Sequence, residues 1–261
     1  MRTSFDPAYF PRLLAIEDRH FWFQARNRVI AAALAPITAA LSPGYRVLEA
    51  GCGTGNVLRV LAKACPEGTV VGLDSFHQGL RMAARRTTVP LIQGDARVAP
   101  FSQPFDIIGL FDVLEHLEED REVLADIRSL LAPGGALVLT VPANPSLWSY
   151  FDEASHHVRR YRERELKDKL VQAGFRLEYV SHYMATIFPL VWLGRKLASA
   201  LKRSSPPAAD RTTELASDEL RIVPLVNPLL RFVLSQEARV VARRRKLPFG
   251  TSLIAVARRP G

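Results

Sequence analysis

A glycine-rich turn within residues 47–56 constrains this chain more than any other stretch. Gly51, Gly53 and Gly55 directly follow a short apolar run over 45–48. The segment 56–65 then places its apolar residues on one helical face, which predicts a strand, a turn and a helix in that order. Glycine is needed where the backbone adopts positive φ or where a ligand touches the main chain. The N–H groups at the start of such a helix form a site for a carboxylate or a phosphate.

The spacing of these glycines disfavours a nicotinamide cofactor. The dinucleotide fingerprint is Gly-x-Gly-x-x-Gly. This chain instead has Gly-x-Gly-x-Gly, with Asn56 at the next position.

Strands and helices alternate along the chain after the turn. Apolar runs typical of buried strands recur at 69–74, 90–95, 105–111, 136–141, 175–183 and 252–258. Amphipathic helical patterns lie between them, at 78–86, 118–131 and 163–173. We expect Pro133-Gly134-Gly135 to end the second of these helices. Such alternation predicts a parallel sheet between two layers of helices.

Four carboxylates fall at or just past the carboxyl ends of the predicted strands: Glu49, Asp74, Asp95 and Asp112. Open sheets of this kind bind their ligands at that edge. We therefore expect the four side chains to surround one ligand site.

These motifs resemble those of class I S-adenosylmethionine-dependent methyltransferases that act on small molecules or lipids. The likeness covers about residues 19–184 and the last strand, and its signature is Glu49-Ala-Gly51-Cys-Gly53-Thr-Gly55. Further matching blocks are Gly94-Asp95, 111–117 and 131–135. The resemblance implies an α/β fold with a Rossmann-like sheet of seven strands, the last antiparallel. N-terminal helices and a helical insertion between strands six and seven would complete it.

The resemblance also implies S-adenosylmethionine as cofactor and S-adenosylhomocysteine as product. Asp74 would accept hydrogen bonds from the ribose hydroxyls, and Asp95 from the adenine amine. Arg26 would reach the cofactor carboxylate, with a surface ion pair as the alternative. The implied cofactor-binding set is Arg26, Glu49, Gly51, Gly53, Gly55, Asp74, Ser75, Phe76, Asp95, Ala96 and Phe111.

Transfer to a hydroxyl would need a base, and histidine is the natural choice near neutral pH. We predict His157 and His116 as catalytic residues, with a structural hydrogen-bonding role as the alternative for His116. The segment around His157 would be costly to bury without a polar ligand. It therefore also supplies the predicted substrate-binding residues Arg159, Arg160 and Tyr161. No metal is expected, because His156 and His157 are adjacent and no cysteine is near.

Three regions are predicted: a helical cap at 1–44, the methyltransferase domain at 45–184 plus 251–259, and an insertion at 185–250. The aromatic segment 19–27 either caps the core or forms a lid over the cofactor. The insertion contains apolar stretches at 187–193 and 222–234, each leading into basic residues, with a polar proline-rich segment at 202–218. It is either a lid over the substrate pocket or an interfacial module that collects a lipid-linked substrate.

The positive charge lies in the second part of the chain. Residues 1–150 hold 14 lysines and arginines against 15 acidic residues, whereas residues 151–261 hold 21 against 11. This asymmetry predicts an acidic partner for the second part: an anionic membrane surface, a phosphorylated substrate or nucleic acid. Nucleic acid is disfavoured, because Asp112-Val-Leu-Glu115 stands where amino-methylating DNA enzymes carry Asn/Asp-Pro-Pro-Tyr/Phe.

Two cysteines make no disulfide framework, and the N-terminus lacks the apolar core of a signal peptide. We therefore expect a cytoplasmic protein, either free or peripheral at the inner membrane face.

The expected reaction is methyl transfer to a small or lipid-linked acceptor, at oxygen rather than nitrogen or carbon. The alternatives are a nucleic-acid (RNA) methyltransferase and a non-catalytic S-adenosylmethionine-binding protein. The acceptor and the oligomeric state stay open.

Overall fold

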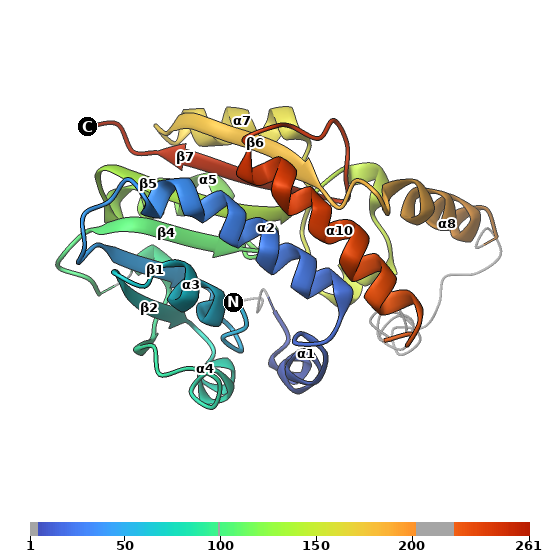
Figure 1. Ribbon diagram of the computed structural model, residues 1–261, viewed down its shortest axis with the longest axis horizontal. Helices are drawn as coiled ribbons and strands as arrows, with labels where there is room; N and C mark the ends of the chain where they lie inside the picture. The colour runs from blue at the N-terminus through green and yellow to red at the C-terminus, as the bar shows by residue number, and fades with distance from the viewer. Residues whose placement is uncertain (1–4, 99, 202–221) are drawn as a thin grey trace.

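The computed structural model describes residues 5–98, 100–201 and 222–261. Its centre is a seven-stranded sheet with the order β3-β2-β1-β4-β5-β7-β6 (Figure 1). All neighbours are parallel except β7, which runs antiparallel to both β5 and β6. The strands are β1 Arg46–Ala50, β2 Thr69–Asp74, β3 Leu91–Gln93, β4 Phe105–Phe111, β5 Leu131–Pro142, β6 Arg176–Tyr183 and β7 Ser252–Arg258. The predicted Rossmann-like sheet with an antiparallel last strand is confirmed.

Helices cover both faces of the sheet (Figure 1). The helices α2 (Phe21–Thr38), α3 (Leu58–Ala64) and α10 (Val226–Ala242) lie on one face, and α5 (Asp120–Leu130) and α7 (Glu163–Gln172) lie on the other. Because successive strand side chains point to opposite faces, Val47 joins the first core and Leu48 joins the second.

The strand β5 departs from its predicted bounds. It begins at Leu131, directly after α5, so that Pro133-Gly134-Gly135 lies inside the strand and does not form a separate stop after the helix. Leu131 pairs with Phe105, the next pair is Ala136 with Ile107, and the register shifts between them. The extra residues of β5 between these two pairs form a bulge, in which Gly134 has φ +78°. The hydrophobic pattern of 118–141 could not predict this bulge, because the bulge depends on how β5 pairs with the neighbouring strand β4.

The insertion contains α8 (Phe188–Leu201) and α10, and α10 lies alongside α2 (Figure 1). Leu234 and Val241 of α10 are buried in the same core as Ile30 of α2. The polar segment predicted at 202–218 lies outside the described residues. Among the described helices, none is both long and apolar enough to cross a membrane.

Candidate active site

A cavity of about 800 Å³ opens at the carboxyl ends of β1, β2 and β4. Its walls come from the glycine turn, from the N-terminal segment before and within α2, from the loops after β4 and β5, and from α8. All predicted cofactor-binding residues line this cavity except Gly55. Of the predicted acceptor-side residues, His116, His157 and Arg160 line it, and Arg159 and Tyr161 do not.

The glycine turn is held in place by the carboxylate of Asp74. Its Oδ2 accepts a hydrogen bond from the Gly53 N–H at 2.7 Å, and its Oδ1 accepts one from the Phe76 N–H at 2.8 Å. Burial raises the pKa of Asp74, and the two N–H donors oppose that shift. Asp74 therefore positions main chain on two sides of the cavity, a task that its strand-end location does not reveal.

Gly51 and Gly55 of the turn both have positive φ, and each lies close to a different side chain. Gly51 has φ +80°, and a Cβ there would lie 2.5 Å from Cγ2 of Val113. Gly55 has φ +77°, and its Cβ would lie 2.9 Å from Cβ of Ala83 in α4 (His77–Ala83). Gly55 thus allows α4 to pack against the turn. Unlike the other predicted cofactor-binding residues, it does not line the cavity.

Glu49 faces the cavity from β1 with an uncompensated carboxyl group. Its side chain is buried, and Oε2 has no hydrogen-bond partner among the described residues. Burial raises the pKa of Glu49 well above its ordinary value, although the charge of Arg26 opposes the shift. A buried carboxyl group of this kind is suited to receive a donor from a ligand.

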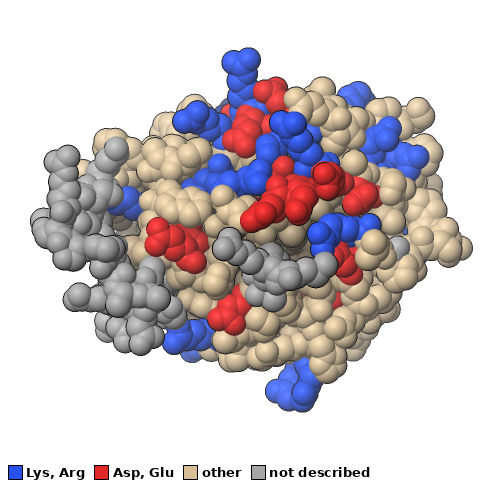
Figure 2. All heavy atoms as spheres, turned by 180° about the vertical axis from the view of Figure 1, so that it is seen from behind, with Lys and Arg blue, Asp and Glu red and all other residues tan. Residues whose placement is uncertain are grey.

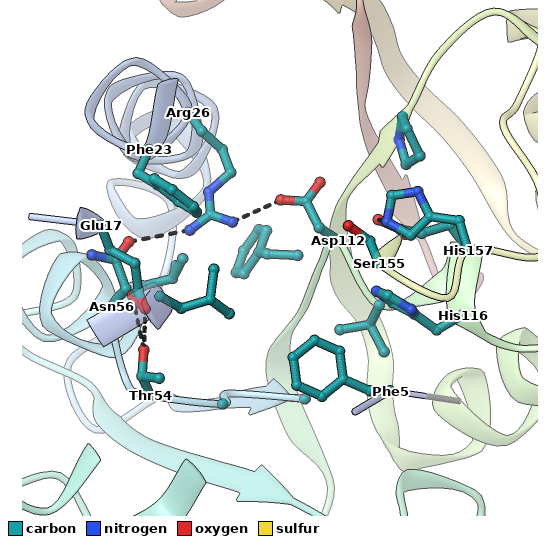
Figure 3. A pocket seen from close by; sticks show the side chains of 18 of the residues that line it. Phe5, Glu17, Phe23, Arg26, Thr54, Asn56, Asp112, His116, Ser155 and His157 are labelled. Atoms are coloured by element: carbon teal, nitrogen blue, oxygen red, sulfur yellow. Dashed lines mark hydrogen bonds and ion pairs between the residues drawn. The ribbon is translucent and has the colours of Figure 1, made fainter. Parts of the chain in front are cut away.

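Arg26 connects α2 to the end of β4 (Figure 3). Its Nη1 donates to Oδ2 of Asp112 at 2.7 Å, and its Nη2 donates to Oδ1 of Asn56 at 3.1 Å. Arg26 thus forms an ion pair, as the alternative predicted, but a largely buried one and not one at the surface. Its contact with the cofactor carboxylate stays a prediction. Asp112 has φ +56°, an uncommon conformation for a residue other than glycine and one that occurs often at functional sites.

Aromatic side chains of the N-terminal segment close one side of the cavity. The rings of Phe5 and Phe10 lie 6.0 and 5.9 Å from the ring of Phe76. Phe23 is buried in α2, and it also lines the cavity. Segment 19–27 therefore both packs on the core and covers the site, so its two interpretations are compatible. Phe5 and Phe10 were not predicted as site residues, because isolated aromatic residues at the start of a chain have no distinctive spacing.

This N-terminal cover is tied to the turn by a buried ionic contact. Glu17 accepts hydrogen bonds from the Thr54 hydroxyl at 2.5 and 2.8 Å and from Nη1 of Arg86 at 2.9 Å. Glu17 follows α1 (Phe10–Ile16), whereas Thr54 lies in the glycine turn. The contact therefore fixes α1 over the cavity.

Asp95 lines the cavity beyond β3, with Ser75 and Ala96 nearby in the lining. Arg97 donates to both carboxylate oxygens of Asp95 and lowers its pKa, mainly through the side-chain hydrogen bonds. The carboxylate stays ionised, and remains an acceptor, over the whole neutral range.

His157 and His116 meet on the other side of the cavity (Figure 3). Nδ1 of His157 lies 2.9 Å from Oδ1 of Asp152, and its Nε2 lies 4.0 Å from Oε1 of Glu115. The ring centroids of the two histidines are 4.8 Å apart. Asp152, in α6 (Tyr150–Ala154), is fully buried and was not predicted as a site residue.

The charge of Asp152 is fixed by its neighbours. Burial alone would raise the pKa of Asp152, but hydrogen bonds from His157 and Arg160 lower it overall. Nε of Arg160 lies 2.6 Å from Oδ1 of Asp152. An ionised carboxylate on Nδ1 orients the imidazole, which itself lines the cavity.

Arg159 and Tyr161 lie away from the cavity, contrary to prediction. Oδ2 of Asp120 accepts hydrogen bonds from Arg159 at 2.9 Å, from the Tyr161 hydroxyl at 2.8 Å and from Lys169 at 2.6 Å. These contacts join α5 and α7 to the chain after β5. The polar groups of this segment are satisfied by a buried aspartate, which sequence spacing could not show, and they do not require a substrate.

A model of a methyltransferase domain family matches residues 19–180, more than half of the chain. Among curated proteins, the chain is 30% identical over 145 residues to a trans-aconitate 2-methyltransferase from Azoarcus sp., covering 55% of each chain. It is 29% identical over 135 residues to phthiotriol/phenolphthiotriol dimycocerosates methyltransferase 1 from Mycobacterium ulcerans, covering 49% of this chain and 50% of that one. The chain spans about half the length of these curated relatives.

A solved structure also shares the fold. The phosphoethanolamine N-methyltransferase 2 of Haemonchus contortus, in complex with phosphomonomethylethanolamine and S-adenosylhomocysteine, superposes with a TM-score of 0.55 at 20% identity. The match covers 88% of this chain and 52% of that one. The shared fold, the glycine turn and the strand-end carboxylates agree with the matched family model. The chain therefore belongs to the class I S-adenosylmethionine-dependent methyltransferase family.

Proposed function

We propose that the chain methylates a hydroxyl group of a small or lipid-linked acceptor, with His157 as the base. The observation that carries this proposal is the Asp152–His157 pair: the buried carboxylate lies 2.9 Å from Nδ1 of an imidazole that lines the cavity. S-adenosylmethionine supplies an already activated methyl group, so positioning provides most of the catalysis, with effective molarities of about 10⁵–10⁸ M attainable. A hydroxyl must lose its proton as it attacks, and an oriented imidazole can accept that proton.

The donors and acceptors of the cavity fit this cofactor. Its ribose hydroxyls and adenine amine are donors, and Asp74 and Asp95 offer acceptors at adjacent strand ends. Its ammonium group suits the partnerless Oε2 of Glu49. The carboxylate suits Arg26 and the N–H groups of the turn, since the open side of Gly53 meets only the Phe10 ring, at 3.5 Å. These residues would hold the cofactor with charge-assisted bonds of about 1.5–3 kcal/mol each.

The acceptor side of the cavity favours an amphiphilic molecule. Ile187, which directly precedes α8, and Val191 of α8 line it together with Phe21 and Trp22 of α2. His157 lines the same cavity beside the buried Asp152. An apolar chain can lie along the helices while a polar head reaches the histidine. We infer a lipid-linked acceptor, and with it peripheral association at the inner face of a membrane.

The test is to find the acceptor. The protein is incubated with methyl-labelled S-adenosylmethionine and with separated membrane and soluble fractions of an extract, and labelled products are identified by mass spectrometry. A labelled O-methyl lipid is expected. Label in RNA alone would favour the nucleic-acid alternative, and binding without any turnover would favour a non-catalytic protein.

A chelator arm of the same assay tests the expected independence of metal. Ligating atoms of Glu115, His116 and His157 lie within 4.8 Å of one another, a spacing that could also hold a metal ion. Turnover should be unchanged by EDTA. Loss of turnover that zinc restores would instead identify these three residues as metal ligands.

A further inference from the structure

A second cavity of about 440 Å³ lies on the outer surface between α2 and α10. Three arginines surround it: Arg28 from α2, and Arg231 and Arg239 from α10. The other lining residues are Pro228, Phe232, Ser235 and Gln236, so no acidic side chain from the described part of the chain contributes. None of the three arginines forms an ion pair with a described carboxylate. The cavity therefore has an uncompensated positive charge.

An apolar ridge runs beside these arginines along the outward side of α10. Leu225, Leu229 and Phe232 are 86%, 61% and 66% exposed, and their spacing of four and three residues places them on one helical face. The opposite face of α10 buries Leu234 and Val241 against the core. The helix is thus anchored on its inner side and apolar again on its outer side. Contiguous exposed apolar residues of this kind mark an interaction surface.

The start of α10 is fixed next to the mouth of the main cavity. The Phe21 N–H donates to Oδ1 of Asn227 at 2.8 Å, and Nδ2 of Asn227 donates to the Arg19 carbonyl at 2.9 Å. Phe21 lines the main cavity, and Arg28 is two turns further along α2, about 10 Å at 1.5 Å per residue. A molecule held at the arginine cavity is therefore close to the route into the active site.

We propose that this α2–α10 face binds the surface of an anionic membrane. The arginine cavity receives lipid phosphate oxygens, which the planar guanidinium group matches well. Leu225, Leu229 and Phe232 enter the acyl boundary, as the apolar face of an interfacial helix does. The proposal builds on the peripheral association inferred above and names the surface responsible for it.

The opposite side of the molecule lacks this charge segregation. Figure 2 shows basic and acidic side chains mixed over that face. The basic run after α10 is also partly neutralised, because Arg244 forms an ion pair with Glu178 at 3.1 Å. Charge and exposed apolar area therefore coincide on the α2–α10 face, which fixes the orientation of the protein on a membrane. A nucleic-acid groove would not need the aliphatic ridge.

The experiment is co-sedimentation of the full chain with vesicles of phosphatidylglycerol and phosphatidylcholine, compared with phosphatidylcholine alone. Binding should require the anionic lipid and should weaken with salt, because the Debye length falls from about 10 Å at 0.1 M to about 3 Å at 1 M. The double variant Arg231→Glu/Arg239→Glu should lose at least about thirtyfold in binding, equivalent to about 2 kcal/mol. The charge-matched control is Arg162→Glu/Arg164→Glu, on exposed positions beside and within α7.

Leu229→Ser/Phe232→Ser tests the apolar part, with exposed Val171→Ser of α7 as its control. All substituted residues are exposed, so unchanged circular dichroism should verify folding. Equal binding by the α10 variants and their controls would overturn the proposal, as would no binding of the unaltered protein at low salt. If light scattering shows that the α10 variants instead separate a dimer into monomers, the face is a subunit interface. Vesicle binding is measured without turnover, so failure of the methyl-transfer proposal remains distinguishable.

Discussion

The carboxylate of Asp74 has two tasks at the end of β2. It accepts main-chain hydrogen bonds from Gly53 and Phe76, and it lines the cavity that would hold the ribose. A carboxylate offers about four acceptor sites, so it can hold the turn and still accept from a ligand. Cofactor affinity and the geometry of the turn are therefore coupled through one side chain.

Replacing Asp74 should weaken cofactor binding in graded steps. Asp74→Asn keeps one acceptor oxygen, whereas Asp74→Ala leaves two buried N–H groups without a partner. We expect Asp74→Ala to lower the affinity for S-adenosylmethionine at least about tenfold, equivalent to 1.4 kcal/mol, and Asp74→Asn to lower it less. Isothermal titration calorimetry measures both. Asp106→Ala is the control, because Asp106 accepts from the Arg46 N–H at the opposite edge of the sheet. Unchanged affinity in Asp74→Ala would refute the assignment.

Glu49 should make stability depend on pH in a definite direction. Its raised pKa means that the folded protein keeps a proton where the unfolded chain, with a pKa near 4.5, has lost it. The folded state then binds more protons, so stability falls as pH rises above that value. Glu49→Gln cannot ionise, so the stability of this variant should fall less as pH rises. Its Tm at neutral pH should increase by about 2–4 °C for each kcal/mol of stability regained.

Thermal melts across the pH range check this effect, with Glu122→Gln, an exposed position of α5, as the control. The same Glu49→Gln variant should bind S-adenosylmethionine more weakly, because glutamine, unlike Glu49, cannot release a proton and face the ammonium group as a carboxylate. If the stability of Glu49→Gln depends on pH as that of the unaltered protein does, ionisation of Glu49 does not cause the loss of stability at higher pH.

Single residues were predictable where a motif fixed their place, and not where a partner from elsewhere decided their role. Asp74 and Asp95 reach the cavity because strand ends meet at one edge of a parallel sheet. Arg159 and Tyr161 instead turn to Asp120 in α5, far from them in sequence. The partner of His157 was missed for the opposite reason: Asp152 is only five residues away, in a short helix that shows no periodic pattern.

The turn between β1 and α3 also contacts β2 and α4. The N–H groups of Gly51 and Cys52 both donate to the Leu73 carbonyl in β2, and Gly55 contacts Ala83 of α4. Elements with a clear period, such as β2, β4 and β7, fall at their predicted bounds. The bulge in β5 was not predictable, because the register of a neighbouring strand fixes it.

Comparing two glycines separates backbone strain from crowding in this turn. Gly55 and Gly134 have φ +77° and +78°, but a Cβ on Gly55 would lie 2.9 Å from Ala83 and one on Gly134 would meet nothing within 4 Å. Gly55→Ala should therefore destabilise the fold more than Gly134→Ala, by about 1–3 kcal/mol of overpacking. Urea unfolding measures the difference. Equal losses would show that α4 moves aside without cost.

At the scale of the whole molecule, the main cavity is lined by segments from both ends of the sequence. The N-terminal cover, the strand ends and α8 all contribute walls, and α10 packs on α2 beside the mouth. The insertion therefore shares the hydrophobic core of the sheet. Its basic excess predicts an acidic partner from composition alone, but only the packing of α10 on α2 reveals which residues stay exposed.

His157 is the proposed base, and a neighbouring histidine offers a matched control for its role. His156 is exposed with φ +55°, a conformation that asparagine tolerates, so His156→Asn and His157→Asn can be compared. Methyl transfer from labelled S-adenosylmethionine is measured with the acceptor fraction, and cofactor affinity by calorimetry. We predict that His157→Asn loses about 10²–10⁴-fold in turnover while cofactor affinity stays within about threefold, and that His156→Asn keeps normal turnover. Equal turnover in the two variants would contradict the account.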